Sequence, residues 1–216
     1  MKIIALILAA GRGTRVGSAI PKQWQHLGNR RIIDHSIDLF KNISRINNVM
    51  VVLHPDDLHL LNRSDVLFTK GGNTRSESVK FGLEALKKNE MPDYVLIHDA
   101  ARPSTPLTVI DNVLDNLASA DAVSPGLPIT DTLWEVIDEE VMQTKSRKNI
   151  WRAQTPQGFN FKKILDAHLA SSSTATDDVE VATSAGIKVK VIHGSEKNIK
   201  ITTAEDFDRV AAFLGF

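Results

Sequence analysis

The sequence contains no cysteine, and its 26 basic and 26 acidic residues leave no net charge. Without cysteine the chain has no disulfide scaffold, no thiolate-ligated metal site and no cysteine nucleophile. The balanced charge argues against a protein dedicated to binding nucleic acid or a membrane surface. No apolar run reaches the ~18–20 residues of a membrane-spanning helix, and the apolar start of the chain lacks a signal-peptide cleavage site. We therefore expect a cytoplasmic protein.

Common catalytic signatures are also missing. The seven histidines show no metal-binding HExxH spacing, and no GxSxG nucleophile elbow occurs. The glycine-rich loop at Gly11-Arg12-Gly13 lacks the Gly-Lys-Ser/Thr sequence of a phosphate-binding P-loop. In the same loop, Val16 occupies the position where the dinucleotide-binding fingerprint has a third small residue. Neither standard nucleotide-binding motif fits this loop.

Apolar runs of strand length alternate with helix-period patterns along the chain. The runs lie at residues 3–8, 49–53, 66–69, 94–97, 122–125 and 189–192, and the helical patterns at 32–40, 75–87, 107–117, 161–169, 178–185 and 204–214. This alternation indicates βαβ units, and continuous apolar runs are typical of strands buried on both faces. With no linker or repeat, the sequence predicts a single Rossmann-like α/β domain over residues 1–216. Its sheet is expected to be mixed, mostly parallel and covered by helices on both faces. Ligands of such sheets bind beyond the carboxyl ends of the strands.

One segment departs from this alternation. Residues 129–151 alternate polar and apolar side chains around the acidic turn Asp138-Glu139-Glu140. The pattern predicts a β-hairpin arm that projects from the domain, and an isolated hairpin is marginally stable in water. We therefore expect a second copy of the chain to support the arm in a homodimer. The alternative is a hairpin that folds back on its own domain.

Positive charge is concentrated at the N-terminal end of the chain. Residues 1–33 contain six basic side chains and no acidic one, which suggests a small anionic substrate. Arg15 lies in the glycine loop, and Lys22 follows Pro21, whose ring restricts the local backbone. Arginine and lysine in this setting suit the negative charge that develops on phosphoryl oxygens. The alternative for both residues is an ordinary solvated surface cation.

A series of ordered motifs extends over most of the chain. The motifs are Ala9-Ala10-Gly11-Arg12-Gly13-Thr14-Arg15 with Pro21-Lys22-Gln23, Gly71-Gly72-Asn73-Thr74-Arg75-Ser76-Glu77-Ser78, His98-Asp99-Ala100-Ala101-Arg102-Pro103, Asp131-Thr132, Trp151-Arg152-Ala153-Gln154-Thr155-Pro156-Gln157, Thr176-Asp177-Asp178 and Asn198-Ile199-Lys200. Together they resemble the motifs of the sugar-phosphate nucleotidylyltransferases. Within that superfamily, the sequence is most similar to the 2-C-methyl-D-erythritol 4-phosphate cytidylyltransferase family.

The resemblance implies roles for individual residues. Arg15 and Lys22 would be catalytic. The nucleotide would contact Ala9, Ala10, Gly11, Gly13, Gly72, Asn73, Ser78, Asp99 and Ala100. The sugar-alcohol phosphate would contact Asp99, Arg102, Thr132, Arg147, Thr176 and Lys200, with Thr132 and Arg147 supplied by the neighbouring subunit's arm. Many relatives have Asp at the position of Asn73, so we expect that contact to differ here. We expect His98 to be a structural residue.

The resemblance also implies a reaction. A phosphate oxygen of 2-C-methyl-D-erythritol 4-phosphate would attack the α-phosphorus of CTP and release pyrophosphate, a step of non-mevalonate isoprenoid biosynthesis. Mg²⁺ or another divalent cation would be held mainly by the phosphates, and no metal-ligating residue is identified. CTP, the sugar-alcohol phosphate and a second copy of the chain are the expected partners, without nucleic acid or membrane. Three alternatives stay open: a ribitol-5-phosphate cytidylyltransferase, a dinucleotide-dependent oxidoreductase and a non-catalytic nucleotide-binding scaffold.

Overall fold

An eight-stranded sheet forms the centre of the protein in the computed structural model, which describes residues 1–12, 20–171 and 175–216. Its strands are β1 (Ile3–Ala9), β4 (Asn48–Leu53), β5 (Leu67–Lys70), β6 (Tyr94–Asp99), β7 (Ala122–Pro128), β10 (Trp151–Ala153), β11 (Gln157–Asn160) and β12 (Val189–His193). The order across the sheet is β10-β7-β11-β6-β1-β4-β5, and β12 also pairs with β7. The helices are α1 (Ile32–Lys41), α2 (Arg75–Asn89), α3 (Leu107–Asn116), α4 (Phe161–Ala170), α5 (Asp178–Ser184) and α6 (Ala204–Leu214), with 3-10 turns η2 (Lys22–Trp24) and η3 (Pro55–Leu60).

The sheet is mixed and mostly parallel, as the sequence predicted. β1 pairs in parallel with β4 and β6, β4 pairs in parallel with β5, and β12 does so with β7. β11 lies antiparallel between β6 and β7, and β10 is antiparallel to β7. β10 and β11 were not predicted from the sequence, because both are short and β11 contains a single large apolar side chain, Phe159. Gly158 is needed there, since a Cβ at this position would lie 2.8 Å from side-chain atoms of Leu117 and Val113.

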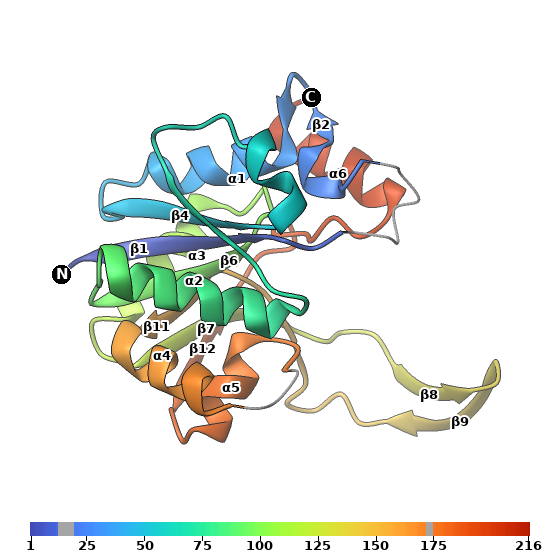
Figure 1. The fold of residues 1–216 in the computed structure, drawn as a ribbon. Coiled ribbons are helices and arrows are strands. Elements are labelled where there is room, and N and C mark those ends of the chain that lie inside the picture. The colour runs from blue at the N-terminus through green and yellow to red at the C-terminus, as the bar shows by residue number, and fades with distance from the viewer. Residues whose placement is uncertain (13–19, 172–174) are drawn as a thin grey trace.

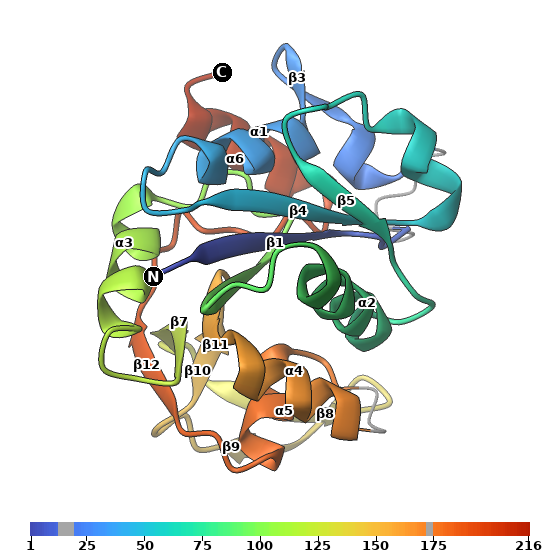
Figure 2. The same ribbon diagram turned by 60° about the vertical axis from the view of Figure 1, so that its left-hand side comes forward.

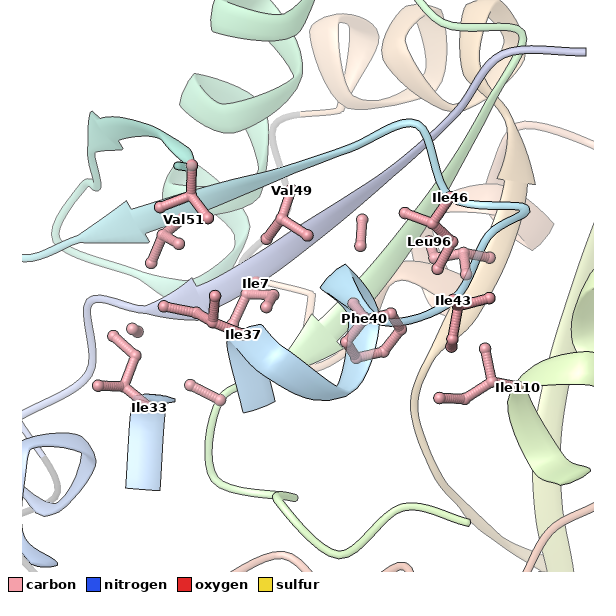
Figure 3. Packing of buried hydrophobic residues seen from close by; sticks show 14 of the residues in the cluster. Ile7, Ile33, Ile37, Phe40, Ile43, Ile46, Val49, Val51, Leu96 and Ile110 are labelled. Atoms are coloured by element: carbon pink, nitrogen blue, oxygen red, sulfur yellow. The ribbon is translucent and has the colours of Figure 1, made fainter. Parts of the chain in front are cut away.

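Helices cover both faces of the sheet (Figures 1 and 2). Alternate residues of β1 point to opposite faces: Ile7 packs with α1 and α3, and Leu6 packs with α2 and α4. Figure 3 shows the first of these clusters, in which Ile37 and Phe40 of α1 lie against the strands. Burying one such side chain stabilises the fold by about 1.5–3 kcal/mol. Two full apolar layers therefore hold the ends of β1 and β6 in place.

The predicted arm is a separate two-stranded hairpin that extends away from the sheet (Figure 1). It consists of β8 (Leu133–Ile137) and β9 (Glu140–Lys145), paired antiparallel. At its base, the backbone N–H of Ile129 donates to the carbonyl of Ile150 at 3.0 Å. The arm ends one residue before the approximate boundary at residue 151, because Trp151 already pairs with Pro128 as the first residue of β10 in the main sheet. In this structure the arm does not fold back on its own domain.

A small second hairpin, β2 (His26–Leu27) with β3 (Arg30–Arg31), precedes α1 and packs near α6 through an apolar cluster that includes Leu27 and Val210. No helix in the described part of the chain has both the length and the apolar character needed to cross a membrane.

Candidate active site

A cavity of about 260 Å³ opens where β1 and β6 end. Its walls come from the segment after β1, from η2, from the turn between β5 and α2, from the end of β6 and from Lys200. The lining residues are Leu8, Ala9, Ala10, Gly11, Lys22, Gln23, Gly72, Asn73, Thr74, Arg75, Ser78, Asp99, Ala100, Ala101 and Lys200. The cavity thus lies beyond the carboxyl ends of parallel strands, where the sequence analysis expected chemistry.

Two chain segments meet closely at one wall of the cavity. A Cβ on Gly71 would lie 2.6 Å from the Cβ of Ala10 and 2.8 Å from the Oγ of Ser78, so only glycine allows this approach. The N–H of Gly72 donates to the Oγ of Ser78 at 3.1 Å. The Thr74 side chain caps the N-terminus of α2 by accepting from the N–H of Glu77. The predicted nucleotide-binding residues of both segments therefore share one rigid wall.

Asp99 is the centre of a cluster of cations at the end of β6. The Nζ of Lys200 lies 2.9 Å from its Oδ2, and the Nε atoms of Arg102 and Arg75 lie 3.6 Å from its Oδ2 and Oδ1, respectively. Burial alone would raise the pKa of Asp99, but Lys200, Arg75 and Arg102 together hold this pKa well below its usual range. The carboxylate therefore stays ionised and fixed in orientation.

Lys22 also lines this cavity. It opens η2 directly after Pro21, and its ammonium group donates to the carbonyl of Ile201 at 2.5 Å. Ile201 is the neighbour of Lys200, so the two lysines are linked through one short segment of backbone. The structure thus brings Lys22, Lys200 and Asp99 together, although they are far apart in the sequence.

Four other residues that were predicted to contact the sugar-alcohol phosphate do not line the cavity of their own chain. Arg102 lies behind Asp99, where it donates to the carbonyl of Asn198 at 2.7 Å. The hydroxyl of Thr176 donates to the carboxylate of Glu180 at 3.2 Å. Thr132 and Arg147 are exposed near the base of the arm, and the Arg147 guanidinium donates to the carbonyl of Thr130. The remaining predicted residues, Gly13 and Arg15, lie outside the residues that the structure describes.

His98 is structural in character, in agreement with the expectation from sequence. It is fully buried, and burial lowers its pKa to about 3, so the ring is neutral at physiological pH. Its Nδ1 lies 3.0 Å from the hydroxyl of Thr155, and its Nε2 lies 3.3 Å from the carbonyl of Arg102. A neutral ring with its proton on Nε2 satisfies both contacts.

Two arginines that contact carboxylates in the structure, Arg75 and Arg12, had no individual role predicted from the sequence. Arg75 lines the cavity as the first residue of α2, where the helix dipole disfavours a cation. That unusual position is a signal the sequence contained. Arg12 contacts the carboxylates of Asp56 and Asp57, and the Nη1 atom donates to Asp57 at 3.0 Å. Arg12 therefore anchors the glycine-rich segment to η3, and within the described residues it is not part of the cavity wall.

Comparison with known proteins identifies the family. The model of the family described as "IspD: 2-C-methyl-D-erythritol 4-phosphate cytidylyltransferase" matches residues 3–215. The 2-C-methyl-D-erythritol 4-phosphate cytidylyltransferase of Roseobacter denitrificans is 43% identical over 99% of this chain and 97% of its own length. The bifunctional enzyme IspD/IspF of Rhodobacter capsulatus is 46% identical over 99% of this chain. The chain spans 56% of that relative, about half the length of the bifunctional proteins it matches.

Solved structures agree with this result. The crystal structure of the Francisella tularensis enzyme of the same name superposes with a TM-score of 0.86 at 28% identity, covering 99% of this chain and 100% of that one. The enzyme of Thermus thermophilus gives a TM-score of 0.84 at 28% identity, covering both chains completely. The predicted α/β fold and the predicted resemblance are confirmed. This chain belongs to the 2-C-methyl-D-erythritol 4-phosphate cytidylyltransferase family.

Proposed function

We propose that the protein transfers CMP from CTP to 2-C-methyl-D-erythritol 4-phosphate, giving 4-diphosphocytidyl-2-C-methyl-D-erythritol and pyrophosphate in non-mevalonate isoprenoid precursor synthesis. The observation that carries the proposal is the cavity in which Lys22 and Lys200 face a glycine-rich wall at the ends of β1 and β6. Its volume of about 260 Å³ is close to the lower end of small-molecule sites, which start near 300 Å³. The base and ribose of CTP would occupy this cavity, with the triphosphate of the nucleotide reaching toward the lysines.

The residues of the cavity wall suit the base and ribose of CTP. Backbone at Ala9, Ala10 and Gly11 and at Gly72 and Asn73 would surround the base and ribose, with Ser78 and Ala100 beside them. A cytosine ring needs a few directed hydrogen-bond partners, which a rigid backbone wall supplies at little entropic cost. The ionised Asp99 would accept a hydrogen bond from a ribose hydroxyl or from the second substrate.

Chemistry at this site requires charge neutralisation more than proton transfer. The attacking oxygen belongs to a phosphate that is already anionic at neutral pH, so the step needs no general base. This agrees with the cavity lining among the described residues, which offers lysines and no histidine or glutamate. Lys22 would stabilise the charge on the α-phosphoryl oxygens, and Lys200 would hold the phosphate of the sugar alcohol. We assign the same catalytic task to Arg15 by family resemblance.

A divalent cation such as Mg²⁺ is part of the proposal. Within residues 1–12, 20–171 and 175–216, no group of three or more acidic or histidine side chains could hold a metal ion. Asp99 is the acidic residue of the described lining, and its oxygens already face Lys200 and two arginines. These residues fit an ion held mainly by the nucleotide phosphates, where it would neutralise the charge of the leaving pyrophosphate.

The arm supports the proposal of a homodimer. Trp134 and Met142 in β8 and β9 are 63% and 59% exposed and lie on the same hairpin as the exposed Val136, Ile137 and Val141. A group of exposed apolar side chains of this kind marks an interaction surface. A second copy would cover them and would bring Thr132 and Arg147 to the neighbouring cavity. In the cavity of their own chain, Arg102 would support Asp99 from behind, and Thr176 would lie at the border of the cavity beside α5. A cytoplasmic location remains a prediction from the sequence.

Pyrophosphate release from CTP and Mg²⁺ tests this function, with 2-C-methyl-D-erythritol 4-phosphate and D-ribitol 5-phosphate assayed in parallel. Rapid release with the erythritol phosphate alone is the expected result. Release with the ribitol phosphate alone would overturn the substrate assignment while keeping the reaction. CTP binding without release from either substrate would leave a nucleotide-binding scaffold and refute the enzyme.

A further inference from the structure

Three side chains from three helices form a connected group behind the cavity. The Nη2 of Arg75, at the start of α2, donates to the Oδ2 of Asp178 at 2.8 Å. Asp178 is the first residue of α5, and its Oδ1 lies 3.1 Å from the Nε2 of His168 in α4. The side chains of Asp178 and His168 are each 1% exposed. Both oxygens of a fully buried carboxylate are therefore bound by partners from other helices.

The Arg75–Asp178 contact is a permanent ion pair. Burial would raise the pKa of Asp178, but Arg75 and the hydrogen bond from His168 lower this pKa below its usual value. Burial would lower the pKa of Arg75, and the nearby Asp178 and Asp99 reverse this effect and raise it. A buried carboxylate without such a partner would cost several kcal/mol. Both groups therefore stay ionised across the physiological pH range.

Arg75 lies between two carboxylates and lines the cavity. Its Nη2 binds Asp178, while its Nε lies 3.6 Å from the Oδ1 of Asp99. A guanidinium group is planar and prefers to bind a single carboxylate through two parallel hydrogen bonds. Without Asp178, Arg75 would be free to turn toward Asp99 and bind it in this bidentate manner. Asp99 would then have less capacity to accept a hydrogen bond from a ligand.

We propose that Asp178 is a positioning residue for the nucleotide cavity: it orients Arg75, which in turn leaves the Asp99 carboxylate directed toward the nucleotide. This inference rests on the proposed function of the cavity as a CTP site. Asp178 does not line the cavity within the described residues, so it acts through Arg75. His168 fixes the other oxygen of Asp178 and so restricts its rotation.

The test compares CTP binding and turnover in Asp178→Asn, Arg75→Ala and the double variant. Asp178→Asn keeps the size of the side chain and removes its charge. Loss of an oriented, charge-assisted hydrogen bond predicts a rise of about tenfold in the Kd and KM for CTP, with kcat changed less than about threefold. In the double variant we expect no further weakening beyond Arg75→Ala, because both changes break the same link. Asp166→Asn, an exposed carboxylate on α4 that pairs with Lys162, is the matched control and should bind CTP normally.

Two outcomes would overturn the positioning role. The first is an Asp178→Asn protein of lowered stability that still binds CTP within twofold of the wild type, which would make the contact purely structural. The second is a double variant whose loss equals the product of the single losses. If Asp178→Asn does not fold, Arg75→Lys carries the test, since lysine keeps the charge but cannot contact both carboxylates in the same way. Unchanged CTP affinity of Arg75→Lys would refute the positioning role of Asp178. A folded wild-type protein that neither binds CTP nor releases pyrophosphate would instead refute the proposed function.

Discussion

Replacing Asp99 with asparagine removes the negative charge around which the site is organised, at nearly constant side-chain size. Three cations would then lose their shared counter-charge, but not equally. Lys200 is 39% exposed, so water screens it, and Arg75 keeps its bond to Asp178. Arg102, at 11% exposure, would keep backbone carbonyl partners and lose its carboxylate. Breaking a buried ion pair costs about 3–5 kcal/mol, and with one cation left buried we expect the lower end, about 3 kcal/mol of unfolding free energy.

Urea unfolding of the wild type and Asp99→Asn, followed by circular dichroism between pH 7 and pH 2.5, measures this difference. The folded pKa of Asp99 is lowered, so its ionised form contributes stability above the unfolded value, about 3.9. The contribution of the ionised Asp99 to stability declines as the pH falls below the unfolded pKa toward the folded pKa. We expect a difference of about 3 kcal/mol at pH 7 that shrinks below about pH 4. Equal stability at pH 7, or a difference that is constant down to pH 2.5, would refute the reasoning.

The remaining predictions concern rate, backbone approach and assembly. Lys22→Ala should lower kcat for pyrophosphate release by about 10²–10³ with the fold intact. Lys162→Ala, on the exposed face of α4, is the control and should leave kcat unchanged. Near-normal turnover of Lys22→Ala would contradict the catalytic role of Lys22. Gly71→Ala should weaken CTP binding and lower stability by about 1–3 kcal/mol, because its Cβ would lie 2.6 Å from that of Ala10; calorimetric binding and thermal unfolding at wild-type values would contradict this. Trp134→Asp should convert a dimer to monomers in analytical ultracentrifugation, and an unchanged sedimentation coefficient would show that the arm is not the interface.

Local signals in the sequence explain why the helices were predicted well. α6 begins at a capping box formed by Thr203 and Asp206, and α2 and α5 begin after the capping side chains of Thr74 and Asp177. Each cap satisfies backbone N–H groups at a defined residue, so the first residue of a helix can be predicted from a few neighbouring residues in the sequence. The apolar runs of β1, β4 and β6 identify strands for a similar reason, since burial on both faces favours apolar side chains at consecutive positions, with the polar residues of β4 and β6 at the strand ends.

Contacts between distant residues explain what the sequence did not reveal. β11 pairs with β6 and β7, and its Gly158 packs closely against Val113 of α3, contacts that no short-range pattern encodes. The ends of β1 and β6 indicated where the cavity would lie. The pairing of Arg75 with Asp178 could not be predicted, because it joins residues 103 positions apart. The placement of Lys22 beside Ile201 depends on the whole fold in the same way.

The reaction that we propose joins the CMP of CTP to a sugar-alcohol phosphate without hydrolysing either compound. Phosphorus NMR of a reaction with CTP, Mg²⁺ and 2-C-methyl-D-erythritol 4-phosphate tests it most directly. We predict two coupled signals of a diphosphate diester that grow together with pyrophosphate, and that do not grow when Lys22 is replaced by alanine. Formation of CMP with pyrophosphate, or of CDP with inorganic phosphate, without any diester signals would contradict the account.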